Sequence, residues 1–280
     1  MSATADPSGA LVTDRAQATP KLSLRDLVVT RRQASGRVVT AADRISFDVA
    51  RGEFVCLLGP SGCGKTSILN VIAGLDAPSS GQALVDGSPI EGPGPGRAVL
   101  FQEPALFPWL SVVGNVELAL KLIGIPPDER HERARSWLAN VHLDRFADTQ
   151  PHELSAGMRQ RAALARALAC DPDVLLGDEP FGALDAQARE LLQDEVQRVW
   201  VESRGAKTFL FVTHNVREAV LLADRVLVMS AAPGRLLEEV RIHAERPRAL
   251  DDALVSRVVS EIHQLLMVEV NKGVADEMGR

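Results

Sequence analysis

The sequence contains no tyrosine, and aromatic residues make up only 4% of its 280 positions. Its three cysteines, Cys56, Cys63 and Cys170, are odd in number and lack metal-site spacing. A disulfide framework is therefore not expected, and reduced thiols in a cytosolic protein are the simpler interpretation. No run of about 18 apolar residues occurs, so no segment is expected to span a bilayer.

The sequence also has no excess of positive charge. The chain carries 31 Lys and Arg against 37 Asp and Glu, a formal net charge of -6, which argues against a nucleic-acid binder. Residues 1–21 lack the basic start and apolar core of a signal peptide. Their Ala, Thr, Ser, Asp and Pro content predicts a disordered N-terminal tail.

Strand-like and helix-like patterns alternate over most of the remaining chain. Residues 22–50 show the alternation of half-buried strands, and 53–59 form the continuous apolar run of a buried strand. Later strand-like runs lie at 173–179, 208–214 and 225–230, and they alternate with helical patterns at 66–75, 155–169, 186–203 and 215–223. This order predicts an α/β fold with a parallel sheet covered on both faces.

Residues 103–152 have a different character. Helical patterns at 112–124 and 128–143 flank a break at Pro126–Pro127, which predicts a helical subdomain. A last amphipathic helix is predicted near 250–270, and the Gly- and Pro-rich residues 75–97 are expected to form turns with short strands.

A glycine-rich loop follows the buried run at 53–59. The segment Gly59-Pro60-Ser61-Gly62-Cys63-Gly64-Lys65-Thr66 fits G-x-x-x-x-G-K-[ST] and is followed by Ser67. In this motif backbone N–H groups surround phosphate oxygens, Lys65 reaches the β- and γ-phosphates, and the Thr66 hydroxyl binds Mg²⁺. The alternative is a turn with an exposed lysine, but the predicted strand and helix on either side favour the phosphate loop.

Two acids end the apolar run at 173–179. Asp178 and Glu179 are expected at the carboxyl edge of the parallel sheet, where such sheets bind ligands. Asp178 is then a candidate Mg²⁺ ligand, and Glu179 could polarise a water for attack on the γ-phosphate. Taken alone, the pair could be only a strand terminus. Gly177 is unusual within a strand and is expected to permit close packing.

Further motifs carry a family resemblance. Leu154–Leu168, LSAGMRQRAALARAL, resembles the LSGGQ signature of ABC-transporter ATPases. The phosphate loop and the segments FQEPALFPW, LLGDEP, GALD and FVTHN stand in the order of that family, over about residues 22–240. The resemblance implies a P-loop NTPase fold: a RecA-like parallel-sheet core, an antiparallel β subdomain and an inserted α-helical subdomain. It also implies a nucleotide-binding domain at 22–242, with its helical subdomain at about 103–165, and a helical extension at 243–280.

The resemblance implies roles for individual residues. Gly59–Ser67 would bind ATP phosphates, and Gln102 resembles the glutamine that contacts Mg²⁺ and the attacking water. Ser155, Ala156 and Gly157 of one subunit would cap the γ-phosphate held by a second subunit. His214 resembles the switch histidine that contacts the γ-phosphate, and Gly182–Asp185 resembles a loop that crosses the dimer interface. Singly, Gln102 could be a surface residue and His214 a helix cap.

The sequence departs from the family pattern at two places. No aromatic residue occurs at Arg31–Val39, where most members stack adenine, so Arg31 or Arg32 could stack instead, or apolar contact near Val39 could hold the base. Ala156 replaces the first glycine of the signature. If that position needs a positive φ, alanine costs roughly 1 kcal/mol there; if not, it is harmless.

Three segments resemble those of the nitrate, sulfonate and taurine importer ATPases. They are MRQR after the signature, FQEPALFPWLSVVGNVELAL, and SAAPGRLLEEVRI near the end of the domain. This implies ATP and Mg²⁺ as cofactors, a homodimer, transmembrane permease subunits and, indirectly, a periplasmic or extracellular solute-binding protein. The expected location is peripheral, on the cytoplasmic face of the inner membrane.

Two alternatives remain for the function, and one for a candidate partner surface. The function could be that of a soluble ABC-type ATPase, or of a non-hydrolysing regulatory subunit. A soluble ATPase of this type usually carries a second module or a coiled-coil insertion, which the chain lacks. Phe107 and Trp109 form a candidate docking surface for a membrane subunit, or else a hydrophobic cluster that packs the helical subdomain.

Overall fold

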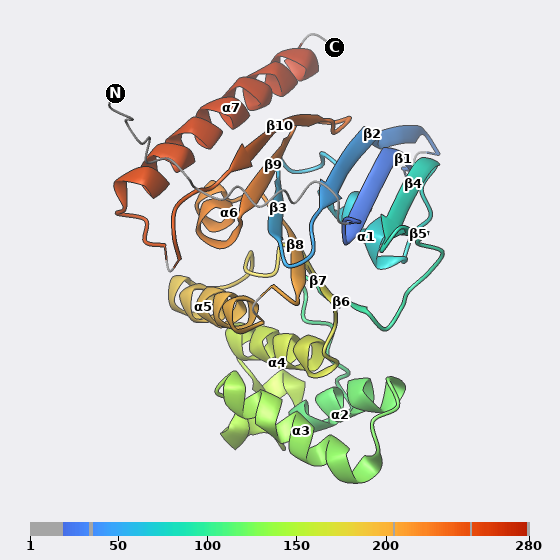
Figure 1. The fold of residues 1–280 in the computed structure, drawn as a ribbon, viewed down its shortest axis with the longest axis vertical. Helices are drawn as coiled ribbons and strands as arrows, with labels where there is room; N and C mark the ends of the chain where they lie inside the picture. Colours follow the sequence, from blue (N-terminus) through green and yellow to red (C-terminus); the bar gives the residue numbers. More distant parts are fainter. Residues whose placement is uncertain (1–18, 34–35, 204, 247, 279–280) are drawn as a thin grey trace, which may run out of the picture.

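The computed structural model describes residues 19–33, 36–203, 205–246 and 248–278, with side chains up to Glu269. The predicted tail at 1–21 therefore lies, except for its last three residues, outside the described residues. Two sheets occupy the upper part of the molecule in Figure 1, and a lobe of helices lies below them. None of the described helices is long and apolar enough to cross a membrane.

The larger sheet has six strands in the order β10-β9-β3-β8-β7-β6. Every neighbouring pair is parallel except β10 and β9. Strands β3, β8 and β9 are buried along their whole length, because both faces of the sheet are covered. The predicted α/β fold with a covered parallel sheet is confirmed. The strands are β3 (Phe54–Leu58), β6 (Arg97–Leu100), β7 (Val174–Asp178), β8 (Thr208–Thr213), β9 (Arg225–Met229) and β10 (Leu236–Arg241).

A smaller antiparallel sheet lies beside the first, in the order β2-β1-β4-β5. Its strands are β1 (Leu22–Arg32), β2 (Val38–Val49), β4 (Ser80–Val85) and β5 (Ser88–Pro89). Helix α1 (Lys65–Ala73) shares one hydrophobic core with both sheets. Val55 and Leu57 of β3 belong to this core, whereas Cys56 and Leu58 belong to the core on the opposite face, as the two-residue period of a strand requires.

The opposite face is covered by helices that continue into the lower lobe. They are α4 (Ala156–Ala169), α5 (Ala186–Glu202) and α6 (Val216–Leu222), with α2 (Val112–Leu122) and α3 (Pro127–Asn140) beyond α4. Short 3₁₀ turns lie at Asp144–Phe146 and Pro151–Glu153. Helix α3 begins at the predicted Pro126–Pro127 break, since proline is well suited to a first helical turn.

Gly177 of β7 packs closely against the neighbouring strand β8. A Cβ on Gly177 would lie 2.7 Å from a ring carbon of Phe211, so the aromatic ring of β8 rests directly on the backbone of β7. The expectation of close packing is confirmed.

The sequence patterns missed two strands and misplaced both ends of the last helix. Strand β6 is only four residues long, and β10 is a mostly exposed edge strand, so neither shows a clear apolar run. Helix α7 (Ala253–Met278) starts after Asp252, whose side chain accepts a hydrogen bond from the Leu254 N–H at 2.8 Å, and it extends past residue 270.

Candidate functional site

The glycine-rich loop joins β3 to α1, as predicted. Gly64 is the N-cap of α1 with φ +90°, and a Cβ there would lie 2.5 Å from the carbonyl oxygen of Ala41. Glycine is therefore needed at Gly64 for both its backbone conformation and its close approach to β2. The loop leaves the first N–H groups of α1 available to an anion, which helix N-termini favour.

Lys65 lies inside this loop rather than on the surface. Its side chain is 4% exposed, and Nζ donates to the carbonyl oxygens of Gly59 and Pro60, both at 2.9 Å. The ammonium is also 3.9 Å from Glu179 Oε1. A buried cation in these surroundings is suited to bind phosphate oxygens. The alternative of an exposed lysine on a turn does not hold.

Thr66 and Asp178 meet across the sheet although they are 112 residues apart. The Thr66 hydroxyl donates to Asp178 Oδ1 at 2.8 Å. Burial raises the pKa of Asp178, and the Thr66 hydrogen bond opposes that rise. A hydroxyl and a carboxylate together fit Mg²⁺, which binds proteins through one or two carboxylates and the phosphates of its nucleotide.

Glu179 and His214 form a second pair at the same edge. The Glu179 Oε2 and His214 Nδ1 atoms are 2.8 Å apart, because β7 and β8 are neighbouring strands that end side by side. Glu179 has φ +43°, a left-handed conformation that costs about 1 kcal/mol for a residue with a side chain. Strain of this kind concentrates at functional sites, where it fixes the direction of a side chain.

Gln102 follows β6 at the same edge but is exposed. Its amide nitrogen is 3.7 Å from the position that a Cβ on Gly182 would take, so it lies next to the loop after Glu179. That loop ends at Asp185, whose side chain caps α5 by accepting a hydrogen bond from the Ala188 N–H at 2.9 Å.

The signature residues lie elsewhere. Ser155 is the N-cap of α4, where its hydroxyl accepts from the Met158 N–H at 3.2 Å, as predicted. Ala156 is the first helical residue and does not have a positive φ, so alanine carries no backbone strain there. Among the described residues, Ser155, Ala156 and Gly157 do not line the cavity around Lys65. The fold therefore does not bring the signature to the phosphate loop of the same chain.

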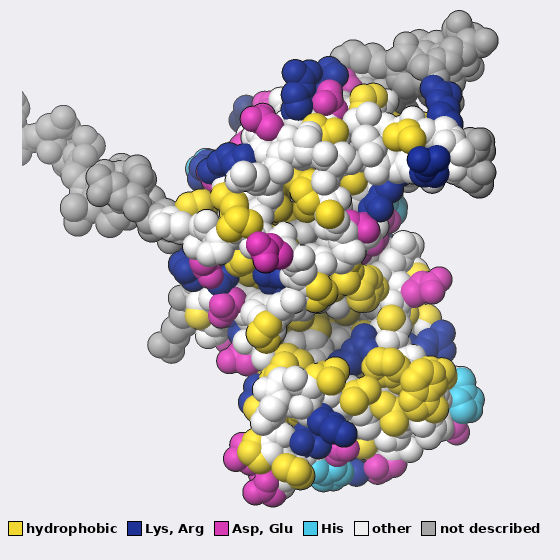
Figure 2. All heavy atoms as spheres, turned by 90° about the vertical axis from the view of Figure 1, so that its right-hand side faces the viewer, with side chains coloured by type: hydrophobic (Ala, Val, Ile, Leu, Met, Phe, Trp, Pro, Cys, Tyr) yellow, Lys and Arg dark blue, Asp and Glu magenta, His cyan; other side chains and the backbone are white. Residues whose placement is uncertain are grey.

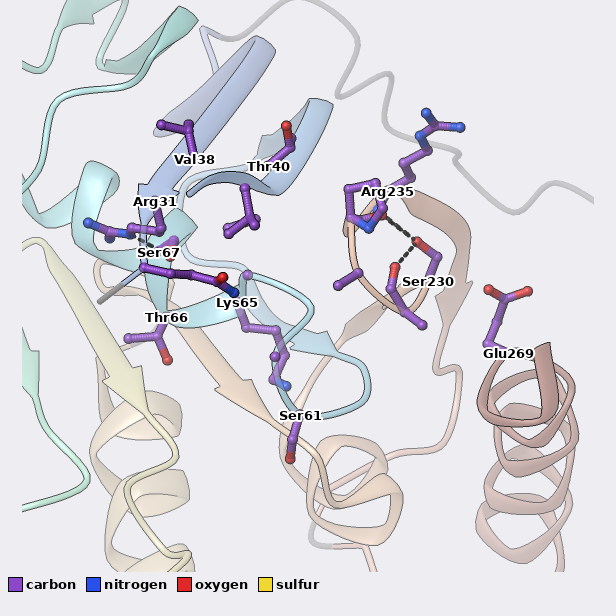
Figure 3. A pocket seen from close by; sticks show the side chains of 18 of the residues that line it. Arg31, Val38, Thr40, Ser61, Lys65, Thr66, Ser67, Ser230, Arg235 and Glu269 are labelled. Atoms are coloured by element: carbon purple, nitrogen blue, oxygen red, sulfur yellow. Dashed lines mark hydrogen bonds between the residues drawn. The ribbon is translucent and has the colours of Figure 1, made fainter. Parts of the chain in front are cut away.

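A cavity of about 1350 Å³ opens above the phosphate loop (Figure 3). Ser61, Gly62 and Gly64–Ser67 line its floor. Gly59, Pro60 and Cys63 are not among the lining residues, and Cys63 is fully buried. One wall of the cavity is formed by Arg31 and residues 37–41.

Two contacts hold the Arg31 guanidinium in place. Its Nη2 atom is 2.5 Å from Asp76 Oδ2, and its Nε donates to Ser67 Oγ at 3.1 Å. Val38, whose side chain is 55% exposed, is the freely accessible apolar residue on this wall.

The sequence patterns did not predict the opposite wall, although residues 230–235 belong to the SAAPGRLLEEVRI segment of the subfamily resemblance. It is formed by the β9–β10 turn at Ser230–Pro233, by Arg235 and by Glu269 of α7, which Figure 3 shows across the cavity from Arg31. The Gly- and Pro-containing turn was the available signal for the first of these. Nothing in the local sequence indicates that the C-terminal helix reaches the cavity.

Phe107 and Trp109 lie on the helical lobe with 36% and 71% of their surface exposed, as expected. Their ring centroids are 5.4 Å apart. Asn115 of α2 fixes the loop, accepting from the Phe107 N–H at 2.7 Å and donating to the Phe107 carbonyl at 3.2 Å. Figure 2 shows apolar side chains gathered on the surface of this lobe.

Comparisons with known proteins agree with this geometry. The family model described as "ABC transporter" matches residues 42–182. An uncharacterized ABC transporter ATP-binding protein of Methanocaldococcus jannaschii is 50% identical over 214 residues, which cover 76% of this chain and 79% of the relative. A taurine import ATP-binding protein of Rhizobium johnstonii is 50% identical over 202 residues, 72% of this chain and 76% of the relative.

A solved structure is also similar to this chain. It is the dimeric post-hydrolysis state of an ATP-binding cassette bound to ADP and phosphate. That structure matches with a TM-score of 0.71 and 30% identity, over 80% of this chain and all of the other.

Proposed function

The chain belongs to the ABC transporter family as an ATP-binding subunit, and from this premise we propose that it hydrolyses ATP to drive import of a solute. The observation that carries the proposal is the convergence of Lys65, the Thr66–Asp178 pair and the Glu179–His214 pair at one sheet edge beside a cavity. These are the groups that phosphate binding, metal binding and water activation require.

ATP would be held mainly by its phosphates. The N–H groups of Gly59–Ser67 and the ammonium of Lys65 surround the β- and γ-phosphates, so that Lys65 exchanges its carbonyl partners for phosphate oxygens. The base would lie against Val38 and Val39, on the wall to which Arg31 also belongs. Apolar contact of this kind holds a base less firmly than an aromatic stack.

Magnesium would be held by Thr66 and Asp178, with Gln102 as the further candidate ligand. The ion would supply positive charge against the charge that develops on the phosphates. Breaking the Thr66–Asp178 hydrogen bond frees both oxygens for this role.

Hydrolysis would use Glu179 as the general base. Glu179 takes a proton from a water whose oxygen attacks the γ-phosphorus, while the bond to the bridging oxygen of ADP breaks. His214 donates its Nδ1–H to Glu179 Oε2 and thereby orients the carboxylate. A second proton on Nε2 would let His214 also contact the γ-phosphate.

Two copies of the chain would complete the site. Ser155 and the first N–H groups of the 14-residue helix α4 form an anion-binding end that this chain's own phosphate loop does not use. In a head-to-tail homodimer, Ser155–Gly157 of one copy would cap the γ-phosphate held by the other. The dimeric cassette among the structural relatives supports this arrangement.

The transport role rests on relatives and on the exposed aromatic surface. Taurine import proteins are about half identical to this chain, which favours import of taurine, sulfonate or nitrate. Permease subunits would dock at Phe107 and Trp109, with a solute-binding protein acting indirectly. The chain would then be peripheral at the cytoplasmic face of the cell membrane. We assign residues 22–242 to the nucleotide-binding domain, about 103–165 of it to the helical subdomain, and 243–280 to a C-terminal extension.

The first test is ATP hydrolysis by the purified protein beside its Glu179→Gln variant. We expect hydrolysis by the wild type, a loss of at least a hundredfold in the variant, and a variant dimer in Mg-ATP by size exclusion, since bound ATP is not consumed. Glu238→Gln, a change at an exposed residue of β10, is the matched control.

Absence of hydrolysis by the wild type, even with its membrane partners, would instead support a non-hydrolysing regulatory subunit. Failure to co-purify with membrane subunits would favour a soluble ABC-type ATPase.

A further inference from the structure

Ser67 carries a hydroxyl in the first turn of α1, at the edge of the nucleotide cavity. The residue lines the cavity beside Lys65 and Thr66. Its Oγ accepts a hydrogen bond from Nε of Arg31 at 3.1 Å. No group in the described part of the chain accepts the proton of the Ser67 hydroxyl. Because a hydroxyl can donate as well as accept, Ser67 keeps one donor for a molecule in the cavity.

Arg31 is fixed on its other side as well. Its Nη2 atom is 2.5 Å from Asp76 Oδ2, and this contact lowers the pKa of the Asp76 carboxyl. Asp76 follows the C-terminal end of α1, so the guanidinium joins the two ends of that helix, and Figure 3 shows its bond to Ser67. Both side chains of the ion pair are partly exposed, so the pair adds little to stability. Its main effect is to fix the direction of the guanidinium.

The place of Ser67 along a bound nucleotide follows from its neighbours. Successive helical residues point roughly 100° apart, so Thr66 faces the metal site while Ser67 faces Arg31. Arg31 in turn pairs with Val39 in the small sheet, on the wall proposed for the base. With the base at this wall and the β- and γ-phosphates at the loop, the α-phosphate lies beside Ser67.

We propose that Arg31 is a positioning residue for nucleotide binding, which holds the Ser67 hydroxyl so that its proton is donated to the α-phosphate. The proposal rests on the nucleotide site described above. Arg31 occupies the only lone-pair direction that a protein donor uses on Ser67 in the described structure, which leaves the hydroxyl proton for the cavity. Asp76 keeps the guanidinium in this orientation before the nucleotide arrives.

The expected effects are moderate because one hydrogen bond is changed at a time. Arg31→Met removes the Nε–H and keeps an apolar stem, and we expect the dissociation constant for Mg-ADP to rise about fivefold. Ser67→Ala removes the donor itself and should raise it about tenfold. Calorimetric titration of the full chain measures both. An unchanged affinity in Arg31→Met would overturn the proposal.

The double variant Arg31→Met/Ser67→Ala decides whether Arg31 acts through Ser67. If it does, the double variant binds Mg-ADP as weakly as Ser67→Ala alone, to within about twofold. If the two losses multiply, to about fiftyfold, Arg31 acts independently of Ser67, and the proposal is overturned. Asp76→Ala is a second variant, in case Arg31→Met does not fold. It should weaken binding about twofold in the wild type and leave Ser67→Ala unchanged, and any other result would count against the proposal.

Two further variants separate the hydrogen bond from the charge. Arg31→Lys keeps the charge without the Nε–H and should lose as much affinity as Arg31→Met, because one ammonium does not replace a guanidinium that contacts two groups. Wild-type affinity in Arg31→Lys would mean that charge alone matters and would overturn the proposal. Arg32→Met is the matched control, since Arg32 is exposed and the next residue of a strand points to the other face. Its affinity should equal that of the wild type, and a loss like that of Arg31→Met would contradict a specific role.

Hydrolysis gives a separate readout. The α-phosphate is not the reacting group, so Arg31→Met should raise KM for ATP about fivefold while kcat stays within about twofold of the wild type. A fall in kcat as large as the rise in KM would indicate a structural role and would overturn the proposal. If the wild type hydrolyses no ATP, the function proposed above fails, while the Mg-ADP titrations still decide the role of Arg31.

Discussion

At the scale of single residues, several groups at the phosphate loop are fixed by contacts from distant parts of the chain. Gly64 has no room for a side chain because of Ala41 of β2, and Thr66 is held by Asp178 of β7. Glu179 keeps a left-handed backbone beside His214. The cavity wall formed by Arg31 and residues 37–41, where we propose that adenine lies, has no such fixed contact partner for the base. Val38 offers apolar surface there without an aromatic ring.

Nucleotide affinity can be tested at this wall. The wild type is expected to bind ATP and GTP with dissociation constants within about tenfold of each other. Val38→Tyr should tighten both about five- to tenfold, since stacking on a base contributes roughly 1–3 kcal/mol. Calorimetric titration measures this, with Val201→Tyr on α5, also an exposed valine, as the control. Strong ATP preference in the wild type would contradict the prediction.

At the scale of elements, the segment between β10 and α7 is attached to the end of α6 by two arginines. Arg248 is 9% exposed and donates to the carbonyls of Val220, Ala223, Ala244 and Ile242. Arg246 pairs with Asp224 and lies 4.2 Å from the ring centroid of Trp200. Burial lowers the pKa of Arg248 to about 10, which leaves it charged at neutral pH.

Removing this attachment should uncouple α6 from α7. Arg248→Met leaves buried carbonyl oxygens without a donor, and we expect the free energy of unfolding to fall by about 2–4 kcal/mol. Urea denaturation measures this loss, and amide exchange should rise first in α6 and α7. Arg257→Met on the exposed side of α7 is the control, expected to change stability by under about 0.5 kcal/mol. Equal loss in both variants would refute a specific role for Arg248.

At the scale of the whole molecule, we propose that three surfaces serve three different partners. The cavity above the phosphate loop suits a nucleotide, the N-terminus of α4 suits a second copy, and Phe107 and Trp109 suit a membrane subunit. The helical lobe carries the last two and lies below the sheets in Figure 1. A coupling between nucleotide and permease would therefore pass through the loop that carries Gln102.

A docking role of Trp109 can be tested separately from a role in stabilising the fold. Trp109 is 71% exposed, so Trp109→Ala leaves no cavity, and thermal stability and ATP hydrolysis by the isolated chain should be unchanged. Solute uptake by the reconstituted transporter should fall at least tenfold, as expected for an aromatic interface anchor. Leu191→Ala on α5 is the exposed control. A loss of stability would instead support a packing role for Trp109 within the helical lobe.

The sequence by itself determined the local structures and the order in which they occur. The phosphate loop, the buried strands, the Ser155 cap and the Pro127 helix start were each predicted from residues within a few positions of one another. Hydrophobic period, capping and glycine conformation act over such short distances. The family resemblance then added roles that local patterns could not supply.

Only the tertiary structure decided which of these parts meet. Thr66 reaches Asp178 across 112 residues, and Glu179 meets His214 because β7 and β8 are neighbours in the sheet. The backbone of Ala156 and the contact between Arg31 and Ser67 also became visible only there. Strand order is set by the packing of the whole core, so contacts between strand ends are not written in any short stretch of sequence.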